Sequence, residues 1–98
     1  MAAYVISDLE PRDEALLAEY RRLAQESIAR HGGRYLARGG EVVPVEGGWT
    51  PRQIVIVEFP SMEAAKGWYG SPDYAKALAV RHRGALERRL IFVEGAPA

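Results

Sequence analysis

One carboxylate stands out among the residues that could carry chemistry in this chain. Glu58 lies in the apolar run Arg52–Phe59, where it interrupts a face that otherwise carries isoleucines. A carboxylate in such a position must be paired, or burial raises its pKa. Glu58 could therefore act as a general base or as a hydrogen-bond acceptor for a ligand. The alternative is a structural ion pair with Arg34, Arg38 or Arg81.

Arginines supply the second chemical possibility, because a guanidinium group can bind a carboxylate through two parallel hydrogen bonds. Arg34 and Arg38 flank Leu36 on one face of a predicted strand, where they could form an anion site or, on an edge strand, face water. Arg81 follows Leu78 by about one helical turn. It could clamp an anionic ligand or interact with the end of its helix, where cations are favoured.

Metal, nucleotide and thiol chemistry have little support in the sequence. His31 and His82 are the only histidines and have neither HxxxH nor HxxE spacing, and the chain has no cysteine. The diglycines match neither GxGxxG nor GxxxxGK, and no serine lies in a G-x-S-x-G elbow. We therefore predict no metal, no haem and no other cofactor.

Length and composition describe one ordinary domain. The 98 residues, with 13 basic and 13 acidic side chains, predict a single domain over residues 1–98 with no net charge. Acids lie among the arginines, which argues against a nucleic-acid partner. No segment has the run of about eighteen apolar residues that a membrane span needs, and MAAYVISDL lacks the basic leader of a signal peptide. We expect a cytoplasmic protein with no membrane partner.

Two helical stretches must help to position the candidate residues. An apolar stripe over Glu14–His31, followed by two glycines, predicts the first helix, with Asp13 as N-cap or, alternatively, Pro11 in the first turn. The second begins after Ser61 and is interrupted at Gly70–Asp73, where Ser71 caps a further helix.

Four strands are predicted, each a short run rich in β-branched, aromatic or other apolar residues. They are Ala3–Ser7, Arg34–Arg38, Arg52–Phe59 and Arg88–Glu94. Together with the helical stretches, the order is β-α-β-β-α-β. Two right-handed crossovers then give a four-stranded antiparallel sheet with helices on one face, which is a ferredoxin-like α+β protomer.

This sheet has apolar side chains on both of its faces. Ile54 and Ile56 alternate with Val55 and Val57, whereas a half-exposed strand should alternate apolar with polar residues. Burying roughly five large side chains is worth on the order of 10 kcal/mol, and association costs about 4–15 kcal/mol. We therefore expect a homodimer packed sheet against sheet, with a hydrophobic ligand or another protein as the alternative cover. Trp49 lies in an arm that contacts the partner subunit or in an exposed loop.

Most of the chain resembles the domain-of-unknown-function family 1330 (DUF1330). The resemblance is carried by HGGRYLARGG (His31–Gly40), GGWTP, VEFPSMEAAKGWYGSPDYAKALAVRHR (Val57–Arg83) and LIFVEG (Leu90–Gly95). The family is similar to dimeric α+β barrel proteins, which implies a protomer whose sheet packs against that of its twin. The same superfamily includes cofactorless antibiotic-biosynthesis monooxygenases, muconolactone isomerases and haem-binding chlorite dismutases, so the fold alone does not fix a function.

The resemblance further implies a ligand site between sheet and helices within each protomer. The family's recurring polar and aromatic positions in this chain are Tyr20, Arg34, Arg38, Glu58, Trp68, Tyr69, Tyr74 and Arg81. We expect Glu58 as the catalytic candidate and the other seven as ligand-binding residues. The aromatic residues could instead belong to the core or hold the break between the helices against the sheet.

Three functions are compatible with these residues. The first is a homodimer with one pocket per protomer for a small anionic or aromatic organic molecule. The second is a cofactor-independent oxygenase or isomerase, in which Glu58 is the base and Arg81 or Arg38 stabilises an enolate-like anion. The third is a purely structural or regulatory dimer, which a cavity filled by side chains would favour.

Overall fold

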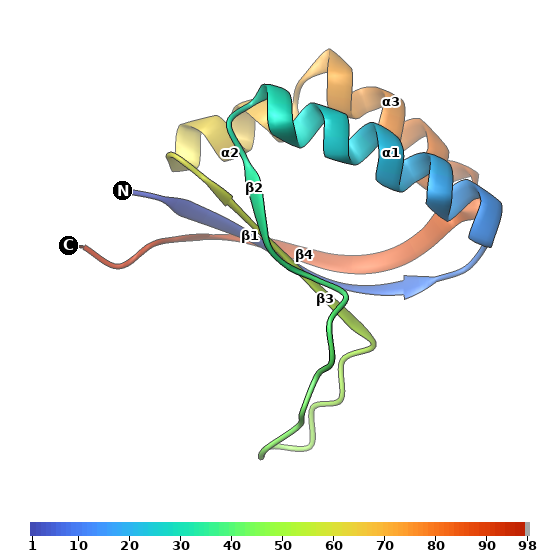
Figure 1. Cartoon of the computed structure of the whole chain (residues 1–98), viewed down its shortest axis with the longest axis vertical. Helices are drawn as coiled ribbons and strands as arrows, with labels where there is room; N and C mark the ends of the chain where they lie inside the picture. The colour runs from blue at the N-terminus through green and yellow to red at the C-terminus, as the bar shows by residue number, and fades with distance from the viewer. Residues whose placement is uncertain (98) are drawn as a thin grey trace.

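A computed structural model, which describes residues 1–97, confirms the ferredoxin-like α+β fold. One antiparallel sheet has the strand order β2-β3-β1-β4, and the helices cover one of its faces (Figure 1). The elements are β1 (Ala3–Pro11), α1 (Glu14–Arg30), β2 (Arg34–Arg38), β3 (Gln53–Phe59), α2 (Met62–Tyr69), α3 (Pro72–Val80), a π-helical turn η1 (Arg81–Ala85) and β4 (Leu86–Glu94). No helix among the described residues combines the length and apolarity needed to cross a membrane.

The ends of α1 follow from local sequence. The Asp13 carboxylate accepts a hydrogen bond from the backbone N–H of Leu16 at 2.9 Å, which confirms it as the N-cap. Gly32 has a φ of +78°, a left-handed conformation that glycine adopts without strain. At Gly33 a Cβ atom would lie 2.7 Å from the Phe59 ring, so the connection from α1 to β2 can pass this close to β3 only without a side chain there.

A polar joint connects α2 to α3. Ser71 caps α3 by accepting a hydrogen bond from the Tyr74 N–H at 3.1 Å, and it donates one to the Trp68 carbonyl at 2.7 Å. Ser61 caps α2 in the same way, with Ala64 as the donor at 3.0 Å. The two predicted caps are therefore confirmed, and the joint fixes two aromatic residues above the sheet.

Strands β1 and β4 are longer than the sequence pattern predicted. β1 continues to Pro11 instead of ending at Ser7, and β4 begins at Leu86 instead of Arg88. The cause is that the alternation continues through the charged residues: Leu9 stays on the buried row, while Asp8 and Glu10 point to the other face.

The expected sharing of one β2 face by Arg34 and Arg38 is wrong. The register against β3 shifts between Tyr35 and Ala37, which marks a bulge. Arg34 pairs with Glu58 on the face away from the helices, whereas Arg38 pairs with Val55. The bulge thus moves Arg38 to the helix side of the sheet, beside Tyr35.

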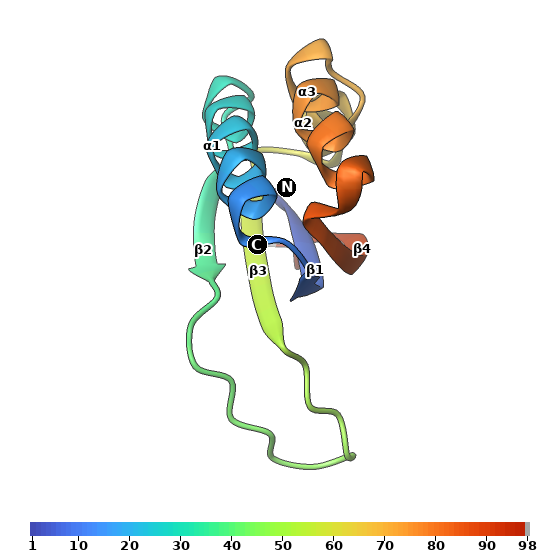
Figure 2. The same cartoon turned by 90° about the vertical axis from the view of Figure 1, so that its right-hand side faces the viewer.

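The face of the sheet away from the helices, which we name the open face, has no cover within the protomer (Figure 2). Ile91 and Val93 of β4 are 59% and 42% exposed there. Ile6, Ile54 and Ile56 lie on the same face and are only partly buried. The predicted apolar character of both faces is therefore present in the folded chain.

The β2–β3 connection, residues 39–52, leaves the sheet as an extended arm without helix or strand (Figure 2). Val43, Val45 and Trp49 on this arm are 69%, 88% and 59% exposed. These apolar side chains make the arm a second surface that the protomer leaves uncovered.

Candidate functional site

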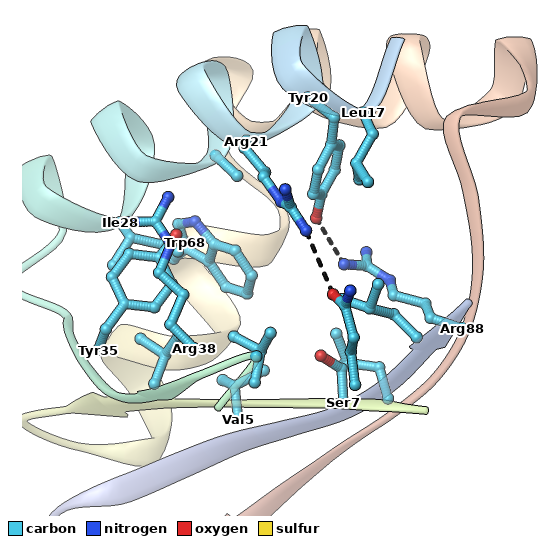
Figure 3. Close-up of a pocket in the computed structure, with 17 residues that line it drawn as sticks. Val5, Ser7, Leu17, Tyr20, Arg21, Ile28, Tyr35, Arg38, Trp68 and Arg88 are labelled. Carbon is cyan, nitrogen blue, oxygen red and sulfur yellow. Dashed lines mark hydrogen bonds between the residues drawn. The ribbon is translucent and has the colours of Figure 1, made fainter. Parts of the chain in front are cut away.

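A cavity of about 490 Å³ lies between α1 and the helix side of the sheet. Figure 3 shows its lining residues, which come from α1, α2 and all four strands. Apolar side chains form most of the wall, including Val5 and Val57 on the sheet, Ile28 on α1 and Trp68 on α2. The cavity is therefore not filled by side chains, and its volume falls in the range of about 300–1,000 Å³ typical of small-molecule pockets.

The end of the cavity beside β2 is polar and reaches the surface. Arg21 donates a hydrogen bond to the Gln53 side-chain oxygen at 3.2 Å, joining α1 to β3. The Arg38 guanidinium lies 4.2 Å from the centre of the Tyr35 ring. Arg21 and Arg38 are both exposed, so we name this region the outer end.

Two tyrosines and an arginine form a hydrogen-bonded cluster at the other end. The Tyr20 and Tyr74 hydroxyls are 2.6 Å apart, and Arg88 donates to both of them at 2.5 Å. Tyr20 comes from α1, Tyr74 from α3 and Arg88 from β4, so the cluster joins the two helices to the sheet. Figure 3 shows Tyr20 and Arg88 with the hydrogen bond between them. Because Tyr20 is 7% exposed and Tyr74 is fully buried, we name this region the inner end.

The protonation of the inner end is fixed by burial. Removal from water raises the pKa of Tyr74 far above its ordinary value, and the nearby Tyr20 adds to the effect more than Arg88 offsets it. Burial by itself lowers the pKa of Arg88, but its contacts with Tyr20 and Tyr74 outweigh this and raise it. Tyr74 is therefore neutral and Arg88 positively charged at physiological pH.

The charge around the cavity has one sign. Arg21, Arg38 and Arg88 line it, and none of its lining residues is an aspartate or a glutamate. Within residues 1–97, no carboxylate lies within 4.0 Å of any of these three guanidinium groups. A cavity of this kind favours an anion with an apolar or aromatic body.

Four of the residues expected from the family resemblance meet at this site. Tyr20, Arg38 and Trp68 line the cavity, and Tyr74 holds Tyr20 from behind. Trp68 also packs 4.2 Å from the Tyr74 ring centre and donates its indole N–H to Ser27 at 2.9 Å. These aromatic residues thus serve the core and the cavity wall at once.

Glu58 and Arg34 lie elsewhere. They form an ion pair of 2.7 Å between Arg34 Nε and a Glu58 carboxylate oxygen. Both belong to the open face, because they are cross-strand partners on the side of the sheet away from the helices. The structure therefore places the expected catalytic residue outside the cavity, in the ion pair that was its alternative.

Tyr69 and Arg81 are also not among the residues that line the cavity. Tyr69 is 40% exposed and packs edge-on against Phe92 on β4. Arg81 begins the π-helical turn, and its buried Nε has no hydrogen-bond partner within the described chain. His31 interacts with the Ser27 carbonyl at 2.9 Å at the end of α1, and the described residues contain no cluster of metal-binding side chains.

The cavity also uses five polar residues that the sequence did not single out. They are Ser7, Arg21, Tyr35, Gln53 and Arg88. The sequence pattern could have indicated Ser7, because it is the polar member of an otherwise apolar row on β1, which consists of Ala3, Val5, Ser7 and Leu9. It could have indicated Arg88 in a similar way, since two-residue spacing places Arg88 in a row with Leu90.

Solved structures share this architecture. A protein of unknown function from Rhodopseudomonas palustris aligns with a TM-score of 0.71 and 23% identity, over 99% of this chain and 84% of that chain. A dimeric protein of unknown function with a ferredoxin-like fold, from Bacteroides fragilis, aligns at 0.64 and 14% over 96% of both chains. SnoaB, a cofactor-independent oxygenase from Streptomyces nogalater, aligns at 0.67 and 9% over 99% of this chain and 95% of that chain.

At these identities the solved structures establish the fold alone. Among curated proteins, none matches the sequence significantly. The model of one protein family, however, matches residues 2–96 and so nearly the whole chain. The chain therefore belongs to the DUF1330 family, a domain of unknown function.

Proposed function

We propose that this protein binds a small anionic organic molecule with an aromatic or apolar body in the cavity beneath α1. The observation that carries the proposal is a pocket of about 490 Å³ lined by three arginines and no carboxylate. Isolated cations are costly to remove from water, so groups such as the Arg88 guanidinium gain most from an anionic partner that excludes water. The valines, Ile28 and Trp68 supply an apolar surface for the rest of the ligand.

The open face supports the second part of the proposal, a homodimer packed sheet against sheet. Ile91 and Val93 are too exposed for a face that remains in water, and large apolar patches on monomers are uncommon. Two ion pairs, Arg34–Glu58 and Asp8–Arg89, neutralise charges on the same face. The Bacteroides fragilis protein with this fold is described as dimeric.

Calorimetric titration with a matched pair of probes tests the ligand. We expect 2-naphthoate to bind about 10-fold or more tightly than 2-naphthamide, because only the carboxylate makes charge-assisted hydrogen bonds with arginine. Arg38→Gln should reduce the affinity for 2-naphthoate, whereas Arg34→Gln, on the same strand but facing the other way, should not. Equal affinity for the two probes, or no binding of either, would contradict the proposal.

A cofactor-independent oxygenase or isomerase is the second candidate. The observation in its favour is the inner end, where Tyr20 and Arg88 present hydrogen-bond donors that could stabilise an enolate-like anion. The chain also shares its fold with SnoaB, which is described as a cofactor-independent oxygenase. Glu58 is on the open face and cannot reach a substrate at the inner end, so it is not the base in this version. Turnover of a phenolic or lactone substrate should therefore survive Glu58→Gln and fall in Tyr20→Phe, and the opposite result would contradict this candidate.

A further inference from the structure

The inner end of the cavity contains a hydroxyl that the fold does not use. Ser7 lies on β1 between Val5 and Leu9, its residue is 6% exposed, and it lines the cavity. Its hydroxyl makes no hydrogen bond to any other residue from 1 to 97. The Ser7 hydroxyl is not among the side-chain atoms that the described residues bury without a partner, so it is open to the cavity, where a polar group of a ligand can pair with it.

The tyrosine cluster also contains a polar group without a partner, as a count of its hydroxyl protons shows. Arg88 donates to the Tyr20 and Tyr74 oxygens, and one of these hydroxyls donates to the other. One hydroxyl proton therefore remains without an acceptor. Tyr74 is fully buried and does not line the cavity, whereas Tyr20 does. The arrangement that leaves no buried donor unpaired has Tyr74 donating to Tyr20, and Tyr20 donating into the cavity.

The strand register places these donors side by side. Ser7 on β1 is the cross-strand partner of Leu90, and Leu9 is that of Arg88, so Ser7 and Arg88 are diagonal neighbours on the same face of the sheet. Arg38 lies in the same row as Ser7 but two strands away, at about 10 Å by the usual strand spacing. The inner donors and the outer arginines are therefore separate polar ends of one cavity.

We propose that Ser7, Tyr20 and Arg88 form a second binding subsite, which receives an oxygen atom of the ligand at the inner end. This inference rests on the proposed function and narrows it. The ligand is an aromatic acid with a second oxygen substituent, such as a hydroxyl or a keto group, on the side opposite its carboxylate. Ser7 can donate to or accept from that oxygen, and Tyr20 and Arg88 donate to it.

The burial of Tyr74 supports this direction of hydrogen bonding. Its raised pKa keeps its proton in place, so it can serve as the donor that fixes the Tyr20 hydroxyl. Arg88 donates a hydrogen bond to each of the two hydroxyl oxygens and places a positive charge beside them. An amine at the same place on the ligand would meet this charge, so the subsite discriminates against ligands with a basic group there.

The test compares 2-naphthoate with 6-hydroxy-2-naphthoate, which differ only in the second oxygen. In the wild-type protein we expect the hydroxy acid to bind about 10-fold more tightly. Tyr20→Phe should reduce this ratio to about 1, and Ser7→Ala should reduce it to about 3. Tyr74→Phe should keep a larger ratio than Tyr20→Phe, because Tyr20 still accepts from Arg88 and donates to the ligand.

Ser7→Ala adds a readout that a purely structural serine would not give. Removing an unpartnered hydroxyl should leave the melting temperature of the ligand-free protein unchanged or higher, while the affinity ratio falls. A lower melting temperature with an unchanged ratio would make Ser7 structural and overturn the inference. Equal affinity of the two acids in the wild type also overturns it, yet leaves the proposed function standing. If neither acid binds, the proposed function fails as well.

Discussion

The two faces of the sheet are built from the same strands but differ in how their charged groups are paired. On the open face, Asp8 and Arg89 are cross-strand partners that form an ion pair of 3.1 Å. One residue away along each strand, Ser7 and Arg88 point to the cavity, where neither has a carboxylate partner. Adjacent residues thus serve different surfaces, because successive side chains of a strand point to opposite sides.

The comparison separates the arginines of this chain that are paired with an acid from those that are free to meet a ligand. Arginines of the open face, such as Arg34 and Arg89, are paired with carboxylates of the same face. The arginines of the cavity have hydrogen bonds or stacking contacts with neutral groups only. Cations that the protein leaves without an acid are the ones available to a ligand.

The largest expected effect comes from breaking the open face alone. Ile91→Asp should shift the protein from dimer to monomer, with the dimer dissociation constant rising about 100-fold or more, because the two-fold interface would bury two unpaired carboxylates. Since Ile91 is 59% exposed in the protomer, the substitution should hardly affect its folding. Sedimentation velocity measures the change, against a chain mass of 10.8 kDa.

Lys76→Asp is the control for that experiment, because it places the same side chain on the exposed surface of α3. It should leave the dimer intact. If Ile91→Asp stays dimeric, the open face is not the interface. If the wild-type protein itself sediments as a monomer, the sheet-to-sheet dimer is excluded.

The next largest effect separates two neighbouring arginines. Arg88→Met should weaken the binding of 6-hydroxy-2-naphthoate about 30-fold or more, because it removes a partly buried charge, a donor to the second oxygen of the ligand and the donor that orients both tyrosines. Arg89→Met, one residue further along β4, should change the affinity by less than about 3-fold, since Arg89 is on the open face. Calorimetry of both variants checks this, and equal losses would mean that the two faces are not independent.

The third effect is a pH dependence of the stability, and it arises from Tyr74 on the helix side of the sheet. The pKa of Tyr74 is raised in the folded state. The contribution of this group to the free energy of unfolding is therefore fully present below the unfolded-state pKa of about 10, and it is lost as the pH rises above that value. In that range the unfolded state releases its proton first, and the free energy of unfolding should fall by up to about 1.4 kcal/mol per pH unit for this group.

Urea unfolding from about pH 9 to about pH 11 measures this slope. Tyr74→Phe should flatten it, although it does not remove the smaller contribution expected from Tyr35, whose pKa is also raised, chiefly by burial. A slope that is unchanged in Tyr74→Phe would show that Tyr74 ionises in the folded protein as readily as in the unfolded one.

Much of the fold could be predicted from local signals. Asp13, Ser61 and Ser71 cap helices as expected, because a short polar side chain just before an apolar stripe can accept a hydrogen bond from a backbone N–H of the first turn. The two apolar faces of the sheet were also visible, since two-residue alternation fixes which residues share a side. The strand ends were missed where charged residues such as Asp8 continue the alternation on the open face.

The candidate site could be predicted only in part, because it depends on register. The bulge in β2 that turns Arg38 to the helix side has no marker in the sequence. Arg88 falls at the expected start of a strand, where a charged residue is usually exposed, and its two tyrosine partners are 68 and 14 residues away. Tyr20 and Trp68 were found through the family resemblance instead, as recurring aromatic positions of the chain.

The smallest expected effect returns to Glu58. Glu58→Gln removes the ion pair with Arg34, whose side chain is 72% exposed, so the free energy of unfolding should fall by less than about 1 kcal/mol. Because the pair is partly in water, most of this loss should disappear at about 1 M salt. The affinity for 2-naphthoate should stay within about 2-fold of the wild type, since Glu58 is on the face away from the cavity. A larger loss of binding would mean that the open face contributes to the ligand site, for example through the partner subunit in a dimer.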